Sequence, residues 1–534
     1  MRAALGDGYV EALRKTWPEV PESADFVMHW WSRAALMVTM GKTRQFGLIT
    51  TNSLRQTFNR RVVQAALEKN LQLTYAIPDH PWVDSANGAA VRIAMTVGTK
   101  TGAANLGSDS RPKIADSDLN FAEHSTTARL LTLTSETTGD FGEVDVTLTE
   151  RNGIIHADLS VGANVASAVQ LEANHNLSNR GVQLFGAGFI VTPEEASAFT
   201  LQGSQTIIRD YRNGRDLTDT PRDVKVIDAF GLTTEQLRTQ YPAIYQWLLE
   251  RVKPEREQNN RASRRDNWWL FGETNPKLRK QLARLPRYIA TVETAKHRTF
   301  QFVDASILPD NMLVAIASKD AFDLGVLSSR VHVSWALAQG GTLEDRPRYN
   351  KSRCFETFPF SAEDTGLTPE LCNKIAALAE QIDAHRKHQQ AANPGLTLTG
   401  MYNLVEALKA GCELTAKEKT IHTQGLVGVL KELHDELDAA VLAAYGLEVG
   451  VSNDALLTHL TALNAQRALE EKTGKIRWLR PEFQNPAFKA SQQLRSNQAL
   501  PEQVPIRLQA DLILVNDSKP PKSGKTTMQT SVQA

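Results

Sequence analysis

The first hundred residues alternate apolar segments of strand length with a helical pattern, and this alternation constrains the fold more than any other feature. Residues 46–50 and 71–77 are short apolar runs, and residues 53–66 between them repeat apolar positions at helical spacing. A strand, a helix and a second strand within about thirty residues form a βαβ unit with parallel strands. With a further strand expected over residues 89–97, we predict an α/β domain whose parallel sheet is covered by helices.

Two helix starts are predicted in the same region. An apolar stripe at helical spacing lies between Ser23 and Met40, so we expect a helix with Ser23 as its N-cap and Gly41 at its end. The stripe consists of Phe26, Trp30, Ala34 and Met37. Ser53 followed three residues later by Gln56 has the pattern of a capping box, which predicts that the second helix begins at Ser53.

The residue composition and the predicted secondary structure change several times after residue 97. Residues 98–195 are rich in Thr and Val, and RLLTLT, EVDVTLT and GIIHADLSV predict antiparallel strands. Residues 196–360 are of mixed α+β character. Residues 361–486 are mostly helical, with helices expected from Thr368–Pro369 and over residues 426–445. We expect residues 487–534 to form an extended, largely disordered tail, because the polar stretch at its end cannot bury enough apolar surface to fold.

Composition excludes several classes of protein. The 534 residues exceed what one hydrophobic core usually covers, so we expect two to four domains. The chain has neither a signal peptide nor an uninterrupted membrane-length apolar run, so we expect a soluble, cytoplasmic protein without a membrane partner. Three scattered cysteines argue against a disulfide framework and against a metal site. HExxH and GxSxG are absent, and SGKTT near the C-terminus lacks the first glycine of a phosphate-binding loop.

Overall charge is balanced, with 60 basic and 60 acidic residues, but residues 251–300 carry a local net charge of +8. Arginines alternate with aromatic residues in RASRRDNWW, and a second basic cluster follows in DRPRYNKSRCF. Arginine and lysine neutralise phosphates, and aromatic rings stack on bases. A solvated helix face is the alternative. The candidate DNA-binding residues are Arg261, Arg264, Arg265, Lys296, Arg298, Arg346, Arg348, Lys351 and Arg353.

A polar, aromatic segment follows the strand at residues 71–77 and contains Asp79, His80, Trp82 and Asp84. In parallel sheets, ligands bind at loops after the carboxyl ends of strands, so these residues are site candidates. The alternative is that Trp82 covers the sheet edge and the carboxylates cap turns.

Several long segments together resemble a known family. They are ESADFVMHWWSRAALMVTMGKTRQFGLITTNSLRQTFNRRVV, AIPDHPWVDSANGAAVRIAMTV, YRNGRDLTDTPRDVKVIDAFG, LPRYIATVETAKHRTFQF and EDRPRYNKSRCFETFPF. From Met1 to about Pro486 the chain is similar to the modification part of the fused type IIL restriction-modification enzymes, which are γ-order adenine-N6 DNA methyltransferases. The resemblance implies methyl transfer from S-adenosylmethionine to an adenine flipped out of double-stranded DNA.

The resemblance assigns a role to each part of the chain. Residues 1–97 correspond to the C-terminal part of a Rossmann-like methyltransferase domain, and residues 98–195 to a β-rich insertion that closes it. Residues 196–360 correspond to a target-recognition domain, and residues 361–486 to a helical C-terminal domain.

The chain also departs from the family pattern. The cofactor-binding FxGxG loop and the catalytic Asn-Pro-Pro-aromatic tetrapeptide are absent, so no catalytic residue carries over. The beginning of this chain resembles the family sequence just after that tetrapeptide. We therefore expect a C-terminal portion of a longer ancestor, with a separate upstream half as partner and S-adenosylmethionine bound only with that half. A non-catalytic DNA-specificity subunit and an inactive gene fragment are the alternatives.

A few residues carry over individually. Trp31 matches a position near the cofactor's adenine ring, with Trp30 as the alternative. Thr51, Asn52 and Ser53 end a strand that faces the site. Asp79, His80, Pro81 and Trp82 match the family's DHPW loop, so with Asn52 they are expected to form a wall of the target-base pocket.

Overall fold

The computed structural model describes residues 5–82, 91–101, 128–138, 144–200, 207–343, 346–485 and 487–488. Residues up to Gln484 belong to one compact unit. The predicted tail lies outside the described residues apart from residues 487–488, and Asp84 lies outside them as well. Among the described residues, no helix combines the length and apolarity needed to cross a bilayer. No group of His, Cys, Asp or Glu in this part of the chain could hold a metal ion.

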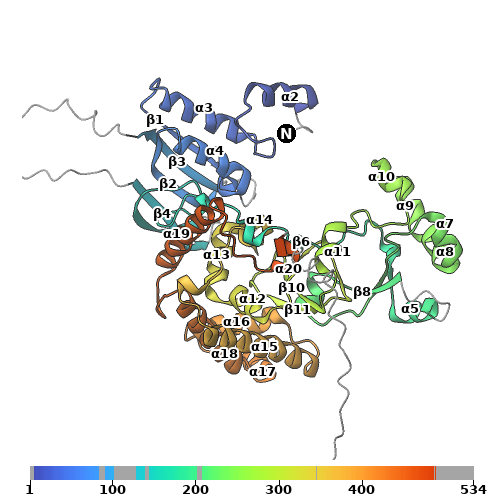
Figure 1. Ribbon diagram of the computed structural model, residues 1–534. Coiled ribbons are helices and arrows are strands. Elements are labelled where there is room, and N and C mark those ends of the chain that lie inside the picture. The colour runs from blue at the N-terminus through green and yellow to red at the C-terminus, as the bar shows by residue number, and fades with distance from the viewer. Residues whose placement is uncertain are drawn as a thin grey trace, which may run out of the picture. The chain divides into compact units, whose positions relative to one another are not determined.

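The N-terminal part of the chain forms the helices α2, α3 and α4 and a five-stranded sheet (Figure 1). These elements are α2 (Asp7–Thr16), α3 (Val27–Thr39), β1 (Gln45–Thr51), α4 (Thr57–Leu67), β2 (Leu71–Trp82), β3 (Val91–Lys100), β4 (Ala128–Thr138) and β5 (Val144–Gly153). The strand order is β1-β3-β2-β4-β5. β3 is antiparallel to both β1 and β2, and β2 is parallel to β4. The α/β character is confirmed, and β1 and β2 run in the same direction, because both are antiparallel to β3. The predicted parallel sheet is wrong, since β2 with β4 is the only parallel pair among the described strands of this sheet.

Both predicted helix starts in this region are wrong. α3 begins at Val27, four residues after Ser23, and its N-cap Phe26 makes no side-chain capping bond. Asn52–Arg55 form a 3₁₀ turn, and α4 begins only at Thr57. The Ser53 hydroxyl instead donates to the Asp25 carboxylate at 2.6 Å, so Ser53 links two segments rather than capping a helix.

The predicted antiparallel strands are confirmed in part. RLLTLT and EVDVTLT lie in β4 and β5, which pair antiparallel. GIIHADLSV does not form a strand, because the chain turns back at Leu159, whose φ is +56°, and only Ile155 and Val161 form an isolated bridge.

The middle of the chain contains two small sheets with short helices around them, in agreement with the α+β prediction. One sheet has the order β11-β10-β13-β6 and the other β12-β8-β9-β7. The strands are β6 (Ser178–Arg180), β7 (Ile190–Val191), β8 (Ile208–Arg212), β9 (Lys225–Ile227), β10 (Arg287–Val292), β11 (Gln301–Asp304), β12 (Leu308–Pro309), β13 (Leu313–Ile316), β14 (Thr342–Leu343) and β15 (Arg346–Pro347). The helices are α5 (Pro193–Thr200), α6 (Gly214–Thr218), α7 (Thr234–Gln240), α8 (Pro242–Arg251), α9 (Lys253–Glu257), α10 (Ala262–Asp266) and α11 (Pro276–Leu282).

Three more helices lie in the predicted α+β region, and the described residues after Pro359 are mostly helical, as predicted. The helices are α12 (Ala321–Ser328), α13 (Arg330–Gly340), α14 (Lys351–Cys354), α15 (Pro369–Ala392), α16 (Leu398–Lys409), α17 (Ala416–Gly425), α18 (Val427–Ala444), α19 (Asn453–Lys472) and α20 (Pro481–Gln484). The Thr368 side chain caps α15 by accepting from the Leu371 backbone N–H, which confirms the predicted start. α15 and α18 bury their apolar stripes in the largest core of the protein.

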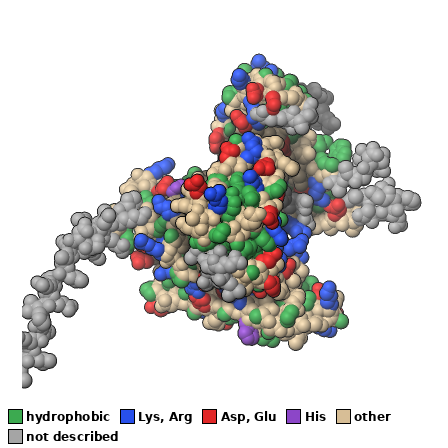
Figure 2. Space-filling model, turned by 90° about the vertical axis from the view of Figure 1, so that its right-hand side faces the viewer, with side chains coloured by type: hydrophobic (Ala, Val, Ile, Leu, Met, Phe, Trp, Pro, Cys, Tyr) green, Lys and Arg blue, Asp and Glu red, His purple; other side chains and the backbone are tan. Residues whose placement is uncertain are grey.

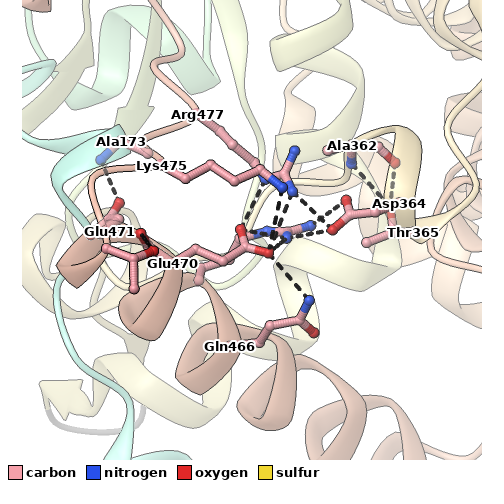
Figure 3. Close-up of polar contacts among 11 residues, drawn as sticks. Ala173, Ala362, Asp364, Thr365, Gln466, Glu470, Glu471, Lys475 and Arg477 are labelled. Atoms are coloured by element: carbon pink, nitrogen blue, oxygen red, sulfur yellow. Dashed lines mark hydrogen bonds and ion pairs between the residues drawn. The ribbon is translucent and has the colours of Figure 1, made fainter.

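A charged network joins α19 to the turn before α15 (Figure 3). The Arg467 guanidinium donates to both carboxylate oxygens of Asp364, each at 2.7 Å, and to Glu470 at 3.0 Å. Arg477 contacts the same two carboxylates at 2.9 and 3.2 Å. The next residue, Glu471, accepts from the Ala173 backbone N–H, which also ties α19 to the segment before β6.

Candidate nucleic-acid interface

The predicted basic segment begins with α9 and α10, where three arginines differ in how they are held. The Arg261 side chain is 67% exposed, and its nearest carboxylate, Glu273, lies at 3.8 Å. Arg264 stacks on the Phe185 ring at 3.5 Å and pairs with Glu273 at 3.2 Å. Arg265 donates to the Asn259 carbonyl at 2.7 Å. Arg261 is therefore the guanidinium of the three with the most freedom to contact an anion.

An open cleft of 580 Å³ lies beside these arginines. Its lining combines amide, hydroxyl, guanidinium and carboxylate groups, which are the groups that contact phosphates and base edges. The polar lining residues are Ser263, Arg264, Asn267, Glu273, Thr274 and Asn275. On the face seen in Figure 2, Lys and Arg side chains are interspersed with Asp and Glu, so the basic residues do not form an unbroken positive surface there.

The aromatic residues of this segment are not arranged as a stacking surface. Trp268 is only 8% exposed and packs edge-on against Tyr245 at 5.7 Å. The Trp269 indole N–H donates to the Leu232 carbonyl at 2.9 Å. The expectation that both tryptophans stack on bases is therefore not supported, because Trp268 belongs to the core of the domain.

The Arg298 side chain stabilises the fold and is not part of an exposed basic surface. Its buried guanidinium donates to the Thr291 hydroxyl at 3.1 Å, to the Val292 carbonyl and to the Pro347 carbonyl at 3.0 Å. The prediction that Arg298 contacts DNA is corrected by this placement. Lys296 remains exposed and donates to the Asn403 side chain at 2.7 Å.

The second basic cluster lies against the first, around Glu293. Arg348 donates to the Glu293 carboxylate at 2.8 and 2.9 Å, and Arg180 contacts the same group. Lys351 pairs with Glu356 at 2.8 Å. Arg346 is exposed. Arg353 makes no side-chain hydrogen bond or ion pair with any described residue, and its Nε is buried.

The structure brings together Asn52 and Asp79 in the N-terminal sheet. The Asp79 carboxylate accepts from the Asn52 amide at 3.0 Å and from Arg92 Nε at 2.7 Å, and Arg92 reaches Glu136 at 2.9 Å. Sequence reasoning missed Arg92, although the pairing of β2 with β3 across a short connection would place it near Asp79.

Residues 79–82 are not the loop that was expected. They continue β2 and pair with β3 after a register shift between Ile77 and His80. His80 Nδ1 lies 2.7 Å from the Pro81 carbonyl, and Trp82 is 48% exposed at the end of the strand. The two side chains thus lie at the end of a strand beside the Asp79 cluster.

Trp31 is fully buried. Its indole N–H donates to the Thr96 hydroxyl at 3.1 Å, and its ring packs edge-on against Phe46 at 5.3 Å. No face of the Trp31 ring is open to a cofactor, so the placement corrects the assignment of Trp31 as a cofactor-binding residue. Trp30, the alternative, is 63% exposed.

Comparison with known proteins finds a family match in the middle of the chain. Residues 179–362 match the family model described as "MmeI, target recognition domain". This part of the chain, the recognition domain, is similar to the target recognition domain of MmeI. The match includes both basic clusters and the 580 Å³ cleft, and it confirms the resemblance to type IIL restriction-modification enzymes.

The fold of most of the chain, including the recognition domain, is similar to that of a solved structure. The type IIL restriction-modification enzyme MmeI, solved in complex with DNA, aligns with a TM-score of 0.63 and 18% identity over 86% of this chain and 55% of MmeI. DNA methyltransferase A of Bacillus subtilis is 29% identical over 99 residues, which are 18% of this chain and 10% of that protein. The chain therefore spans about half of MmeI and a tenth of the methyltransferase.

Proposed function

We propose that this chain provides DNA recognition to a site-specific adenine-N6 DNA methyltransferase of a restriction-modification or phage-defence system. The observation that carries the proposal is the match of residues 179–362 to the MmeI target recognition domain. The ligand is double-stranded DNA, since MmeI was solved in complex with DNA. Arg261 and the cleft beside it supply the groups that such a contact needs.

In this proposal, methyl transfer requires an upstream methyltransferase half that is not among these 534 residues. The 534 residues contain no Asn-Pro-Pro-aromatic tetrapeptide, and the residue expected beside S-adenosylmethionine, Trp31, has no accessible face. The described residues therefore do not fit the cofactor by themselves. Asn52 and residues 79–82 would contribute one wall of the target-base pocket, and an upstream methyltransferase half would bring the cofactor and the catalytic tetrapeptide.

The edge of the N-terminal sheet offers a place for that half. Within the described residues β1 hydrogen-bonds only to β3, so its other edge presents unpaired backbone groups. Ile49 on β1 is 55% exposed, and Trp30 and Met40 at α3 are 63% and 57% exposed. Exposed apolar side chains beside an open strand edge favour pairing with another chain.

The second candidate is a DNA-specificity subunit that has no role in catalysis. The same missing tetrapeptide favours it, because recognition needs only residues that the chain contains. An inactive fragment is the third candidate. Co-expression with an upstream half that carries FxGxG and Asn-Pro-Pro-aromatic separates these candidates, because only the first predicts saturable S-adenosylmethionine binding and adenine methylation by the pair.

DNA recognition itself is tested by selecting duplexes from a random pool and measuring affinity at several salt concentrations. Replacing Arg261, Arg264 and Arg265 together by Gln should weaken binding and lower the salt slope by a few units at most, about one for each phosphate that the variant no longer neutralises. The matched control replaces three exposed cations elsewhere, Arg33, Lys417 and Lys419, by Gln. Equal slopes for the wild type and both triple variants would contradict the proposal.

In the reconstituted pair, Trp82→Ala should reduce turnover more than DNA affinity, because Trp82 lies beside the Asn52–Asp79 cluster rather than in the recognition domain. Tyr9→Ala, which removes an exposed aromatic side chain of the same N-terminal region without an assigned role, is the control. A loss of DNA affinity with unchanged turnover would remove Trp82 from the base pocket.

A further inference from the structure

A second cleft, with a volume of 250 Å³, is lined partly by N-terminal elements and partly by Leu337, Ala338 and Gly341 of the recognition domain. It is lined by α4, the segment after β5, α13 and α19, which meet behind the N-terminal sheet. Its charged lining residues are Arg55, Arg60, Arg151, Asp158 and Asp454. Asn52 of the candidate base pocket lies on its rim.

Arg60 is the unusual member of this lining. Its side chain is almost entirely buried, at 5% exposure, yet its Nε has no hydrogen-bond partner. Within the described residues, the Arg60 guanidinium group makes no hydrogen bond and has no carboxylate within 4 Å. Burying a cation without a partner costs free energy, and this burial lowers the pKa of Arg60. A charge kept at such a cost indicates a ligand that neutralises it.

Asp158 is a nearby carboxylate that favours the charged form of Arg60, but the two side chains form no ion pair among the described residues. Asp454 is engaged by Arg151, and the Asp158 carboxylate accepts from the Ser160 backbone N–H at 3.1 Å and from its hydroxyl at 2.6 Å. Arg353 on α14 adds another positive charge: burial first, and then repulsion from Arg60 and Arg61, lower its pKa to about 10. Arg353 also has a buried Nε without a partner.

We propose that this cleft binds a phosphate group through Arg60, assisted by Arg55 at its lining and by Arg353 behind it. A guanidinium presents planar, forked N–H donors that match the oxygens of a phosphate, and two or three such groups compensate its charge. The cleft has room for a phosphate and part of the group that carries it. The phosphate belongs either to the DNA backbone or to a free phosphorylated molecule, and the two sources are distinguishable.

The first experiment uses inorganic phosphate and the full chain without DNA. Thermal unfolding is measured in phosphate and in chloride at equal ionic strength, because a ligand that binds the folded state raises the unfolding temperature with its concentration. The wild type should be stabilised by phosphate, whereas Arg60→Met should not respond. Arg33→Met, which removes an exposed arginine with the same change of charge, should respond like the wild type.

Arg60→Met has a second expected signature in chloride. Replacing an unpaired buried cation by an apolar side chain of similar length should leave the unfolding temperature unchanged or raise it. If Arg60→Met does not fold, Arg60→Lys keeps the charge without the planar fork and should show a reduced response to phosphate. Equal phosphate responses in the wild type and in the Arg60 variants, or no response in the wild type beyond that of chloride, would overturn the proposal.

The second experiment identifies the source of the phosphate and rests on the proposed DNA recognition. If a backbone phosphate occupies the cleft, Arg60→Met should lower the salt slope of duplex binding by about 0.9, and inorganic phosphate should compete with DNA. An unchanged slope together with the phosphate response of the first experiment would assign the cleft to a free phosphorylated molecule. Failure of DNA binding altogether affects only this second experiment.

Discussion

The recognition domain and the cleft at Arg60 hold arginine in opposite ways. In the recognition domain, Arg298 is buried but donates to several backbone carbonyls, and Arg279 makes two hydrogen bonds to Asp228 at 2.6 and 2.9 Å. In the cleft, Arg60 is buried without a hydrogen-bond or ion-pair partner among the described residues. The number of basic residues in a segment therefore does not measure the charge that is available to a ligand.

This comparison predicts that the fold excludes unpaired cations from its core elsewhere. Burial lowers the pKa of His332 to about 3, with Arg298 adding repulsion, and burial lowers that of His434 to about 3, with Arg386 adding repulsion. Both histidines are neutral in the folded state while the unfolded chain takes up protons below about pH 6.5. Each therefore stabilises the fold above pH 6.5, and this contribution is lost as the pH falls toward 3, by about 1.4 kcal/mol per pH unit.

Asp323 acts with the opposite sign. Burial raises its pKa to about 7, so its contribution is present below about pH 4 and is lost as the pH rises toward 7. Between pH 4 and 6.5 these three groups together should contribute a slope of about 1.4 kcal/mol per pH unit to the free energy of unfolding, increasing with pH. Asp323→Asn should double this slope, and replacing both histidines by Gln should reverse it. Urea unfolding of the wild type and of both variants at several pH values measures these slopes. A slope unchanged by Asp323→Asn would refute the raised pKa of Asp323.

Arg298→Met is expected to have the next largest effect. It removes the Arg298 donor from the Val292, Glu293 and Pro347 carbonyls, although the last two still accept from the Tyr349 and Ala295 backbone N–H groups, so the free energy of unfolding should fall by about 2 kcal/mol. The same substitution at Arg60 should not destabilise the protein. If Arg298→Met and Arg60→Met lower the free energy of unfolding equally in chloride, hydrogen-bond partners do not determine how much a buried arginine contributes to stability.

Arg467→Met tests a partnered, buried arginine in the helical region. Asp364, its main partner, is 35% exposed, so solvent screening reduces the expected loss to about 1–2 kcal/mol. The hydrogen bond from Arg467 lowers the pKa of Asp364, so this contribution is present above about pH 4 and is lost as the pH falls below it. Urea unfolding should therefore show the difference between variant and wild type shrinking below pH 4. A difference that stays constant with pH would mean that lost packing, rather than charge, causes the effect.

Sequence patterns predicted the elements better than their connections. The Thr368 cap and the helix over residues 426–445 were predictable because capping and helical periodicity are local. The pairing of β1 with β3 was not, because it depends on which strand edge a later segment fills. Of the candidate residues, Asn52 and Asp79 do lie together.

The predictions for Trp31 and Arg298 failed for a shared physical reason. An aromatic ring or a guanidinium has the same chemistry in a core as in a site, and burial by residues distant in the sequence decides between them. Trp31 donates to Thr96, 65 residues away, and Arg298 donates to Pro347, 49 residues away. No local pattern around either residue indicates these partners.

The smallest expected effect separates a free arginine from a partnered one within the recognition domain. Arg261→Gln should leave the unfolding temperature unchanged, because the side chain is 67% exposed and its nearest carboxylate is 3.8 Å away. If Arg261 contacts one DNA phosphate, the salt slope of duplex binding should fall by about 0.9. Arg287→Gln is the control, since Arg287 belongs to the same basic segment but stacks on Phe302 at 3.5 Å and pairs with Glu380 at 2.5 Å. Arg287→Gln should leave the slope unchanged, because its guanidinium is already occupied within the protein. A larger fall for Arg287→Gln than for Arg261→Gln would mean that exposure in the free protein does not indicate which arginines meet the DNA.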